Sequence, residues 1–120
     1  MRSISHWQKK EPTEFTTTPA KAINILLKKS NVSADSIDFY EINEAFSVVA
    51  KVNMQLLNIP RGKINVHGGA VALGHPIGCS GNRIVVSLLN ILELNNAHFG
   101  IAAVCNGGGG ASAILIERIS

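Results

Sequence analysis

The stretch from Asn82 to Leu94 is the sequence feature that most constrains the fold. From Ile84 onward its apolar side chains, at helical spacing, surround nearly the whole circumference, and only Ser87 and Asn90 interrupt them before Glu93. A helix that is apolar on all sides is stable only when it is covered on all sides. One sheet can cover one face, so the pattern predicts that the other face meets a second domain or a second copy of the chain, and it favours a homo-oligomer. A central position in one compact domain is the alternative.

The rest of the chain alternates strand-like and helix-like segments. Short β-prone runs occupy residues 2–8, 36–42, 63–66, 99–105 and 112–119, and helical patterns occupy residues 19–31, 44–58 and 82–94. Thr18 before Pro19 is typical of a helix N-cap, and Asn31 of a helix end. This βαβαβαββ order predicts an α/β fold, a five-stranded, mostly parallel mixed sheet with helices on both faces. At 120 residues, 46% of them hydrophobic, the chain is expected to form one domain.

Composition excludes several classes of function. The net charge of +3 is dispersed, with one Trp and one Tyr beside it, so nucleic acid is not an expected partner. No apolar run approaches ~18 residues, which argues against a membrane span, and the first residues lack the apolar core of a signal peptide. Two cysteines are too few for a disulfide scaffold and favour a reducing, intracellular compartment. The histidines and cysteines lack metal-site spacing, so no metal is expected.

Three polar motifs follow predicted strands or stand beside glycine. They are NEAF after Ile42, GHPIG in the loop after Val66, and CNGGGG at the end of the strand that closes with Cys105. In open α/β sheets ligands bind at the carboxyl ends of strands, so we expect Asn43, His75 and Cys105 to lie at one site. Glycine clusters here indicate that something approaches the backbone closely. They match neither nucleotide-binding glycine pattern.

Each of these residues also has a purely structural interpretation. Asn43 is a favoured N-cap for a helix beginning at Glu44. A single loop histidine such as His75 is more often structural than catalytic. Cys105 suits a small buried apolar position, and Cys79 is interpreted as a packing residue.

Together the motifs are specific. YEINEAFSVVA, INVHGGAVALGHPIGCSGNR and VCNGGGGASAILIER occur in an order and at a spacing that resemble the C-terminal domain of the thiolases, most closely the acetyl-CoA C-acetyltransferases. The resemblance extends over essentially the whole chain. The GGGGASA ending disfavours the related ketoacyl synthases, which share the fold but arrange cysteine and histidine differently.

The resemblance implies a role for each matching residue. His75 is similar to the histidine that lowers the pKa of the nucleophilic cysteine and hydrogen-bonds the thioester oxygen of the enolising acetyl-CoA. Asn43 resembles the residue that orients a water in the same oxyanion hole. Cys105 matches the cysteine that removes the α-proton in synthesis and returns it in thiolysis, and Gly107 matches a backbone donor of the second oxyanion hole. Substrate contacts are implied at two further residues, Phe46 and Gly74.

The resemblance also implies what these residues cannot do alone. The family takes up an acetyl group on a cysteine of an N-terminal domain, and neither Cys79 nor Cys105 matches it. That domain and the coenzyme A-binding loop domain are absent from residues 1–120, so we expect half of an enzyme, inactive alone, with acetyl-CoA and acetoacetyl-CoA as substrates, no cofactor, and a cytoplasmic or mitochondrial location. The ending ERIS is not a peroxisomal signal. A non-catalytic module that self-associates or binds a partner through the apolar helix is the alternative.

Overall fold

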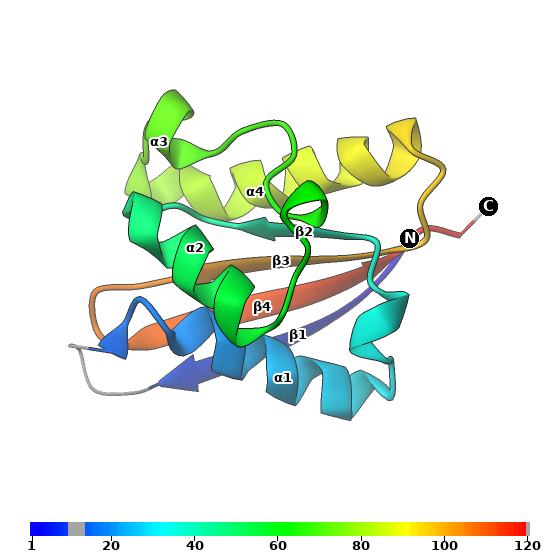
Figure 1. Cartoon of the computed structure of the whole chain (residues 1–120), viewed down its shortest axis with the longest axis horizontal. Helices are drawn as coiled ribbons and strands as arrows, with labels where there is room; N and C mark the ends of the chain where they lie inside the picture. Colours follow the sequence, from blue (N-terminus) through cyan, green and yellow to red (C-terminus); the bar gives the residue numbers. More distant parts are fainter. Residues whose placement is uncertain (10–13, 120) are drawn as a thin grey trace.

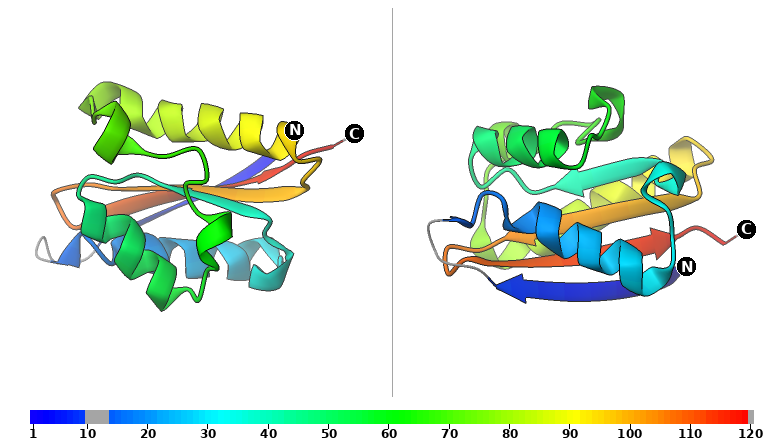
Figure 2. Two further views of the ribbon diagram at one scale, coloured as in Figure 1. Left: turned by 45° about the horizontal axis from the view of Figure 1, so that its top comes forward. Right: turned by 60° about the horizontal axis from the view of Figure 1, so that its bottom comes forward.

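The computed structural model describes residues 1–9 and 14–119 and has three layers, with a sheet between helices (Figure 1). Helices α1 (Thr18–Ser30) and α2 (Ser47–Leu56) lie on one side of the sheet, and α4 (Ile77–Leu94) lies on the other, as the turned views in Figure 2 show. The short elements η2 (Ala34–Ser36), η3 (Arg61–Lys63) and α3 (Ala70–Leu73) connect them. This arrangement confirms the predicted α/β class.

The sheet has four strands in the order β1-β4-β3-β2. They are β1 (Arg2–Lys9), β2 (Phe39–Ile42), β3 (Phe99–Cys105) and β4 (Gly110–Glu117). Strands β2 and β3 are parallel, whereas β4 pairs antiparallel with both β3 and β1. The prediction of five strands, most of them parallel, is therefore wrong in these details.

The missing fifth strand, expected at residues 63–66, is replaced by a bend. Only Ile64 forms a parallel bridge there, to Tyr40. Asn65 then takes a left-handed conformation (φ 47°), which ends any extended run. Its side chain carries out the pairing instead, since the Ile42 N–H donates to Asn65 Oδ1 (2.8 Å) and Asn65 Nδ2 donates to the Ile42 carbonyl (2.9 Å). An asparagine side chain thus substitutes for a strand at the open side of β2.

Helix boundaries differ from the predicted ones where a cap was misassigned. Helix α1 begins at Thr18, so its N-cap is Thr17, and it ends at the left-handed Asn31 as predicted. Helix α2 begins at Ser47 after an extended Phe46, so Asn43 is not its N-cap. Helix α4 begins at Ile77, directly after Pro76, five residues before the predicted start at Asn82.

Two apolar clusters hold the layers together. The larger one lies between the sheet and α1 with α2, and the smaller one lies under α4. Glycine is required at one contact of the second cluster, because a Cβ on Gly100 would stand 2.7 Å from Leu88 Cδ1. The side of α4 that faces the sheet is buried through four residues, Ile84, Leu88, Ile91 and Leu92.

No described residue covers the other side of α4. Val86 is 57% exposed and Leu94 is 67% exposed, whereas Leu88 is fully buried. A groove of about 220 Å³ runs between α4 and the sheet and is lined by Ile84, Val104 and Ile114 among others. The prediction that one sheet covers one face of this helix is confirmed, and the nature of any partner stays a prediction.

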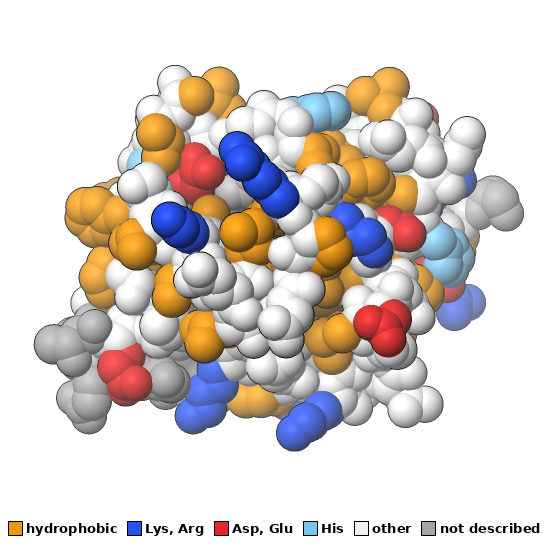
Figure 3. All heavy atoms as spheres, in the orientation of Figure 1, with side chains coloured by type: hydrophobic (Ala, Val, Ile, Leu, Met, Phe, Trp, Pro, Cys, Tyr) orange, Lys and Arg blue, Asp and Glu red, His pale blue; other side chains and the backbone are white. Residues whose placement is uncertain are grey.

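By length and composition alone, α4 is also apolar enough to cross a membrane, the one such helix among the described residues. Core helices of soluble proteins pass the same test, and the buried side of α4 packs on the sheet. The space-filling view in Figure 3 shows Lys and Arg side chains scattered among apolar and uncharged groups on the face that Figure 1 turns to the viewer.

Candidate active site

The end of β2 supplies the most deeply buried polar group of the site. Asn43 follows Ile42, and its N–H donates to the Ala103 carbonyl of β3 (2.9 Å), which continues the parallel pairing by one residue. Its side chain is fully buried. Because β2 and β3 run parallel, Asn43 and Cys105 leave the sheet at the same edge, as predicted from the strand order.

His75 reaches this edge from the turn between α3 and α4. Gly74 has a φ of 89°, a conformation that residues with a Cβ rarely adopt, and this turns the chain toward Asn43. The Asn43 amide nitrogen lies 3.5 Å from His75 Nδ1 and 3.4 Å from Nε2. The structure therefore brings Asn43 and His75 together.

Helix α4 holds the two side chains in place through residues that the sequence analysis did not single out. Ser80 Oγ lies 2.5 Å from His75 Nδ1 and also donates to the Pro76 carbonyl (3.1 Å). Arg83 Nη2 donates to Asn43 Oδ1 (3.3 Å). With Nδ1 engaged by Ser80, Nε2 is the ring nitrogen of His75 left for proton transfer. Ser80 and Arg83 stand three residues apart, so they share one side of the helix.

Glu41 is a buried carboxyl next to this group. It stands two residues before Asn43 on β2, so both side chains point toward α4. Glu41 is 1% exposed, and burial raises its pKa to about 7 even though the Arg83 guanidinium acts to lower it. Among the described residues neither Glu41 oxygen has a hydrogen-bond partner, and neither do Nε and Nη1 of Arg83.

The second residue of NEAF organises the first glycine cluster. Glu44 Oε2 accepts from the Val71 N–H (3.0 Å) in the first turn of α3, and Oε1 accepts from Asn65 Nδ2 (3.4 Å). A Cβ on Gly69 would stand 2.6 Å from Glu44 Oε2. The glycine therefore lets the loop close on this carboxylate.

The second glycine cluster is a tight turn between β3 and β4. Asn106 Oδ1 accepts from the N–H groups of Gly108 (3.1 Å) and Gly110 (3.0 Å), and Gly109 has a φ of 78°. A Cβ on Gly110 would stand 2.6 Å from Asn106 Nδ2. At Gly107, by contrast, no described atom lies within 4 Å of where a Cβ would be. Gly107 is exposed.

Cys105 is placed differently from Asn43 and His75. It belongs to the apolar cluster on the side of α1 and α2, and burial raises the pKa of its thiol. In the part of the chain that the structure describes, no hydrogen bond links Cys105 to Asn43 or His75. Its burial agrees with the structural interpretation of this residue, and its catalytic role stays a prediction, whereas Cys79 is exposed and is not the packing residue that was predicted.

Phe46 follows Asn43 by three residues and is 62% exposed. Its ring meets the Phe15 ring edge-on, with centroids 6.0 Å apart. Within residues 1–9 and 14–119, no group of three His, Cys, Asp or Glu side chains could hold a metal ion.

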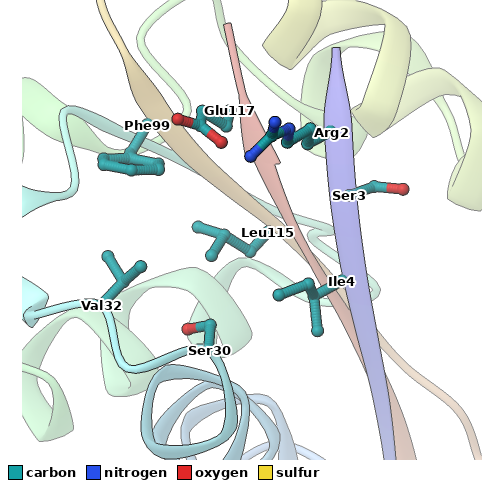
Figure 4. A pocket seen from close by; sticks show the side chains of 8 residues that line it. All are labelled: Arg2, Ser3, Ile4, Ser30, Val32, Phe99, Leu115 and Glu117. Atoms are coloured by element: carbon teal, nitrogen blue, oxygen red, sulfur yellow. The ribbon is translucent and has the colours of Figure 1, made fainter.

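The larger hollows lie away from His75. A cavity of about 420 Å³ is lined by Arg2, Val32, Phe99 and Glu117 among others, at the opposite end of β3 from Cys105 (Figure 4). A groove of about 1020 Å³ between α2 and η3 is lined by Glu44 and Asn65 among others.

Comparison with known proteins gives consistent matches. The family model described as "Thiolase, C-terminal domain" matches residues 2–118. Acetyl-CoA acetyltransferase IA of Candida tropicalis is 52% identical over 99% of this chain and 30% of that protein. Acetyl-CoA acetyltransferase 1 of Arabidopsis thaliana is 54% identical over 91% of this chain and 26% of that protein. The chain thus spans about 30% of the length of the curated relatives it matches.

Solved structures agree with these matches. The Acat5 thiolase of Ascaris suum in complex with coenzyme A superposes with a TM-score of 0.91 at 47% identity, over 97% of this chain and 30% of that chain. Human mitochondrial 3-ketoacyl-CoA thiolase superposes with a TM-score of 0.92 at 34% identity, over 96% of this chain and 29% of that chain.

Proposed function

The chain belongs to the thiolase family as a C-terminal domain of the acetyl-CoA acetyltransferase kind, and on that premise we propose that it supplies the acid–base half of an acetyl-CoA C-acetyltransferase. The complete reaction is the Claisen condensation of two acetyl-CoA molecules to acetoacetyl-CoA and its reverse thiolysis. The observation that carries the proposal is the buried Asn43 amide facing the ring of His75 at the carboxyl end of β2.

In this proposal His75 acts through Nε2, since Ser80 engages Nδ1. Nε2 takes the proton of the acyl-accepting cysteine and, in the next step, Nε2–H donates to the thioester oxygen of the second acetyl-CoA. Asn43 Nδ2 adds a donor on the same side, directly or through a water. Donors aimed at a developing oxyanion in a buried site each contribute about 3 kcal/mol to transition-state stabilisation.

Cys105 is the proposed proton carrier of the carbon–carbon step. In acyl transfer coenzyme A leaves as a thiolate, which then takes the proton of the Cys105 thiol. The Cys105 thiolate formed in this way removes a proton from the methyl carbon of the second acetyl-CoA. The resulting carbanion attacks the acetyl thioester, and the enzyme cysteine leaves as a thiolate. In thiolysis the Cys105 thiol gives the proton back. The raised pKa of the buried thiol keeps it protonated at rest, which suits this donor role.

Three further residues are proposed to shape the substrate site. Gly107 is exposed, and its N–H is proposed to donate to an acyl oxygen. Gly74 sets the turn before His75, and the exposed ring of Phe46 offers an apolar contact for the substrate. No cofactor is proposed, because the coenzyme A thioester is itself the substrate.

The proposal is tested by separating the half-reactions. With acetyl-CoA the 120-residue chain should show no acetyl adduct on Cys79 or Cys105 by mass spectrometry, because the acyl-accepting cysteine is proposed to lie in a part of the enzyme outside these residues. A stoichiometric adduct with turnover by this chain alone would contradict the proposal.

The chain is then fused to the N-terminal part of a related acetyl-CoA acetyltransferase. Cys105→Ser should retain acyl transfer but lose carbon–carbon bond formation, whereas His75→Ala should impair both. Cys79→Ser is the matched control and should retain both half-reactions. Equal losses in the two steps for Cys105→Ser and His75→Ala would refute the assigned roles.

The alternative is a thiolase-like module without catalysis that associates through α4, and the exposed Val86 and Leu94 favour it. Under both proposals the exposed face of α4 is covered, either by another part of a thiolase or by a second copy of this chain. Val86→Asp should shift the chain toward monomer in sedimentation, while Lys51→Asp on α2 should not. A catalytically complete fusion that still needs Asn43 and His75 would exclude the module without catalysis.

A further inference from the structure

Arg83 contacts the proposed catalytic machinery from an element that supplies none of its reacting groups. It stands in the second turn of α4, three residues after Ser80, and its Nη2 donates to Asn43 Oδ1 at 3.3 Å. Ser80, one helical turn earlier, contacts His75 Nδ1. One side of α4 therefore holds both Asn43 and His75.

The chemistry of a guanidinium decides how the Asn43 amide is oriented. Arginine has donors and no acceptor, so the amide atom that faces Arg83 must be the oxygen. The nitrogen is then directed to the opposite side, where it lies 3.4 Å from His75 Nε2. If the amide turned over, two sets of N–H donors would face each other in a buried site, and the oxygen would face the histidine ring.

Glu41 is a second buried polar group that faces α4 from this end of the sheet. Among the described residues its oxygens have no hydrogen-bond partner, so Arg83 bonds to the Asn43 amide and not to this carboxyl. The charge of Arg83 partly offsets the cost of ionising the buried Glu41, so a variant that removes Arg83 is best tested together with removal of this carboxyl.

We propose that Arg83 is a positioning residue of this site, which fixes the Asn43 amide with its nitrogen toward His75. This inference rests on the proposed function for the meaning of the site. Its test uses no acyl-CoA, so failure of the proposed reaction and failure of this inference give different results.

The experiment is nitrogen-15 NMR on the 120-residue chain. The side-chain signals of Asn43 are assigned by their loss in Asn43→Ala, and the ring signals of His75 by their loss in His75→Ala. Arg83→Met removes the donor to Asn43. The double variant Glu41→Gln with Arg83→Met removes the donor and also the buried anion, so it should unfold at a higher urea concentration than Arg83→Met alone. Arg61→Met, at an exposed arginine in η3, is the matched control.

The folded double variant should show shifted Asn43 Nδ2 nitrogen and proton signals, with faster exchange of these protons with water, together with shifted His75 ring signals. Arg61→Met should show neither change. If the double variant regains stability while its Asn43 and His75 signals stay shifted, Arg83 positions the amide and its role is not purely structural. A folded double variant with wild-type Asn43 and His75 signals would overturn the inference.

A measurement on the wild-type chain covers variants that do not fold. The Nη protons of Arg83 should exchange slowly and give cross-peaks to Asn43, because the guanidinium is held by its acceptor. A guanidinium at Arg83 that rotates and exchanges as fast as that of Arg61 would equally overturn the inference.

Discussion

Asn53 is a buried polar side chain that joins two helices, and its replacement tests how α1 is held in the fold. It lies in α2 and is fully buried. Its Oδ1 accepts from the Ala20 N–H (2.7 Å), and its Nδ2 donates to the carbonyls of Thr16 (2.6 Å) and Val49 (2.7 Å). The hydroxyl of Thr17, the N-cap residue, turns back to the Glu14 carbonyl instead. Asn53 therefore caps the first turn of α1 from a neighbouring helix.

Asn53→Leu keeps the volume of the side chain and removes all three hydrogen bonds. Each such bond contributes about 0.5–1.5 kcal/mol net, and buried partners left without one add a desolvation cost. The expected loss is therefore about 3 kcal/mol of unfolding free energy. Small domains are stable by only about 5–15 kcal/mol, so the loss should be plain in a urea titration.

The assay is urea unfolding followed by far-ultraviolet circular dichroism. Asn24→Leu is the matched control, because Asn24 lies on the exposed side of α1 and its replacement should change stability by less than about 0.5 kcal/mol. An Asn53→Leu chain as stable as the control would show that these bonds are not what holds α1, and it would refute the capping argument.

Three further outcomes are expected. Gly100→Ala should destabilise the fold by about 1–3 kcal/mol because its Cβ meets Leu88, and adding Leu88→Ala should change stability by less than the sum of the two single losses, as urea titration would show. The raised pKa of Glu41, about 7 against 4.5, means that its ionisation opposes folding, so wild type should lose roughly 3 kcal/mol relative to Glu41→Gln between pH 4.5 and 7. A thiol reagent should label the exposed Cys79 well before the buried Cys105, as peptide mass spectrometry would show.

The main elements of the fold could be predicted because their patterns are local. Apolar runs such as Phe99–Cys105 and the proline-led helix from Thr18 carry their own signals in sequence. The bend at Asn65 could not be predicted, since KINV has the composition of a strand. No strand forms there because the Asn65 side chain hydrogen-bonds to the backbone of Ile42, and the spacing of residues in the sequence does not predict that contact.

The candidate site was predictable only in part for the same reason. The rule that strand ends gather ligands placed Asn43 and His75 at one edge, and the structure brings them together. Ser80 was missed because residues 77–81 were expected to be loop, whereas Arg83 lay in the predicted helix but was not connected with Asn43. A usable signal was present, since Arg83 is the single charged residue between Pro76 and Glu93 on an otherwise apolar helix.

Helix α4 explains why the all-round apolar pattern and the polar exceptions occur together. Its inner side packs on the sheet through residues such as Leu88, so substitution there tests folding and not association. Its first turns carry Ser80 and Arg83, the two polar side chains that contact His75 and Asn43. The outer side, which includes Val86, is exposed, and no described residue covers it. Because apolar surface favours burial by about 25 cal/mol per Å², a surface that covers this outer side would also hold the two site-supporting turns against β2.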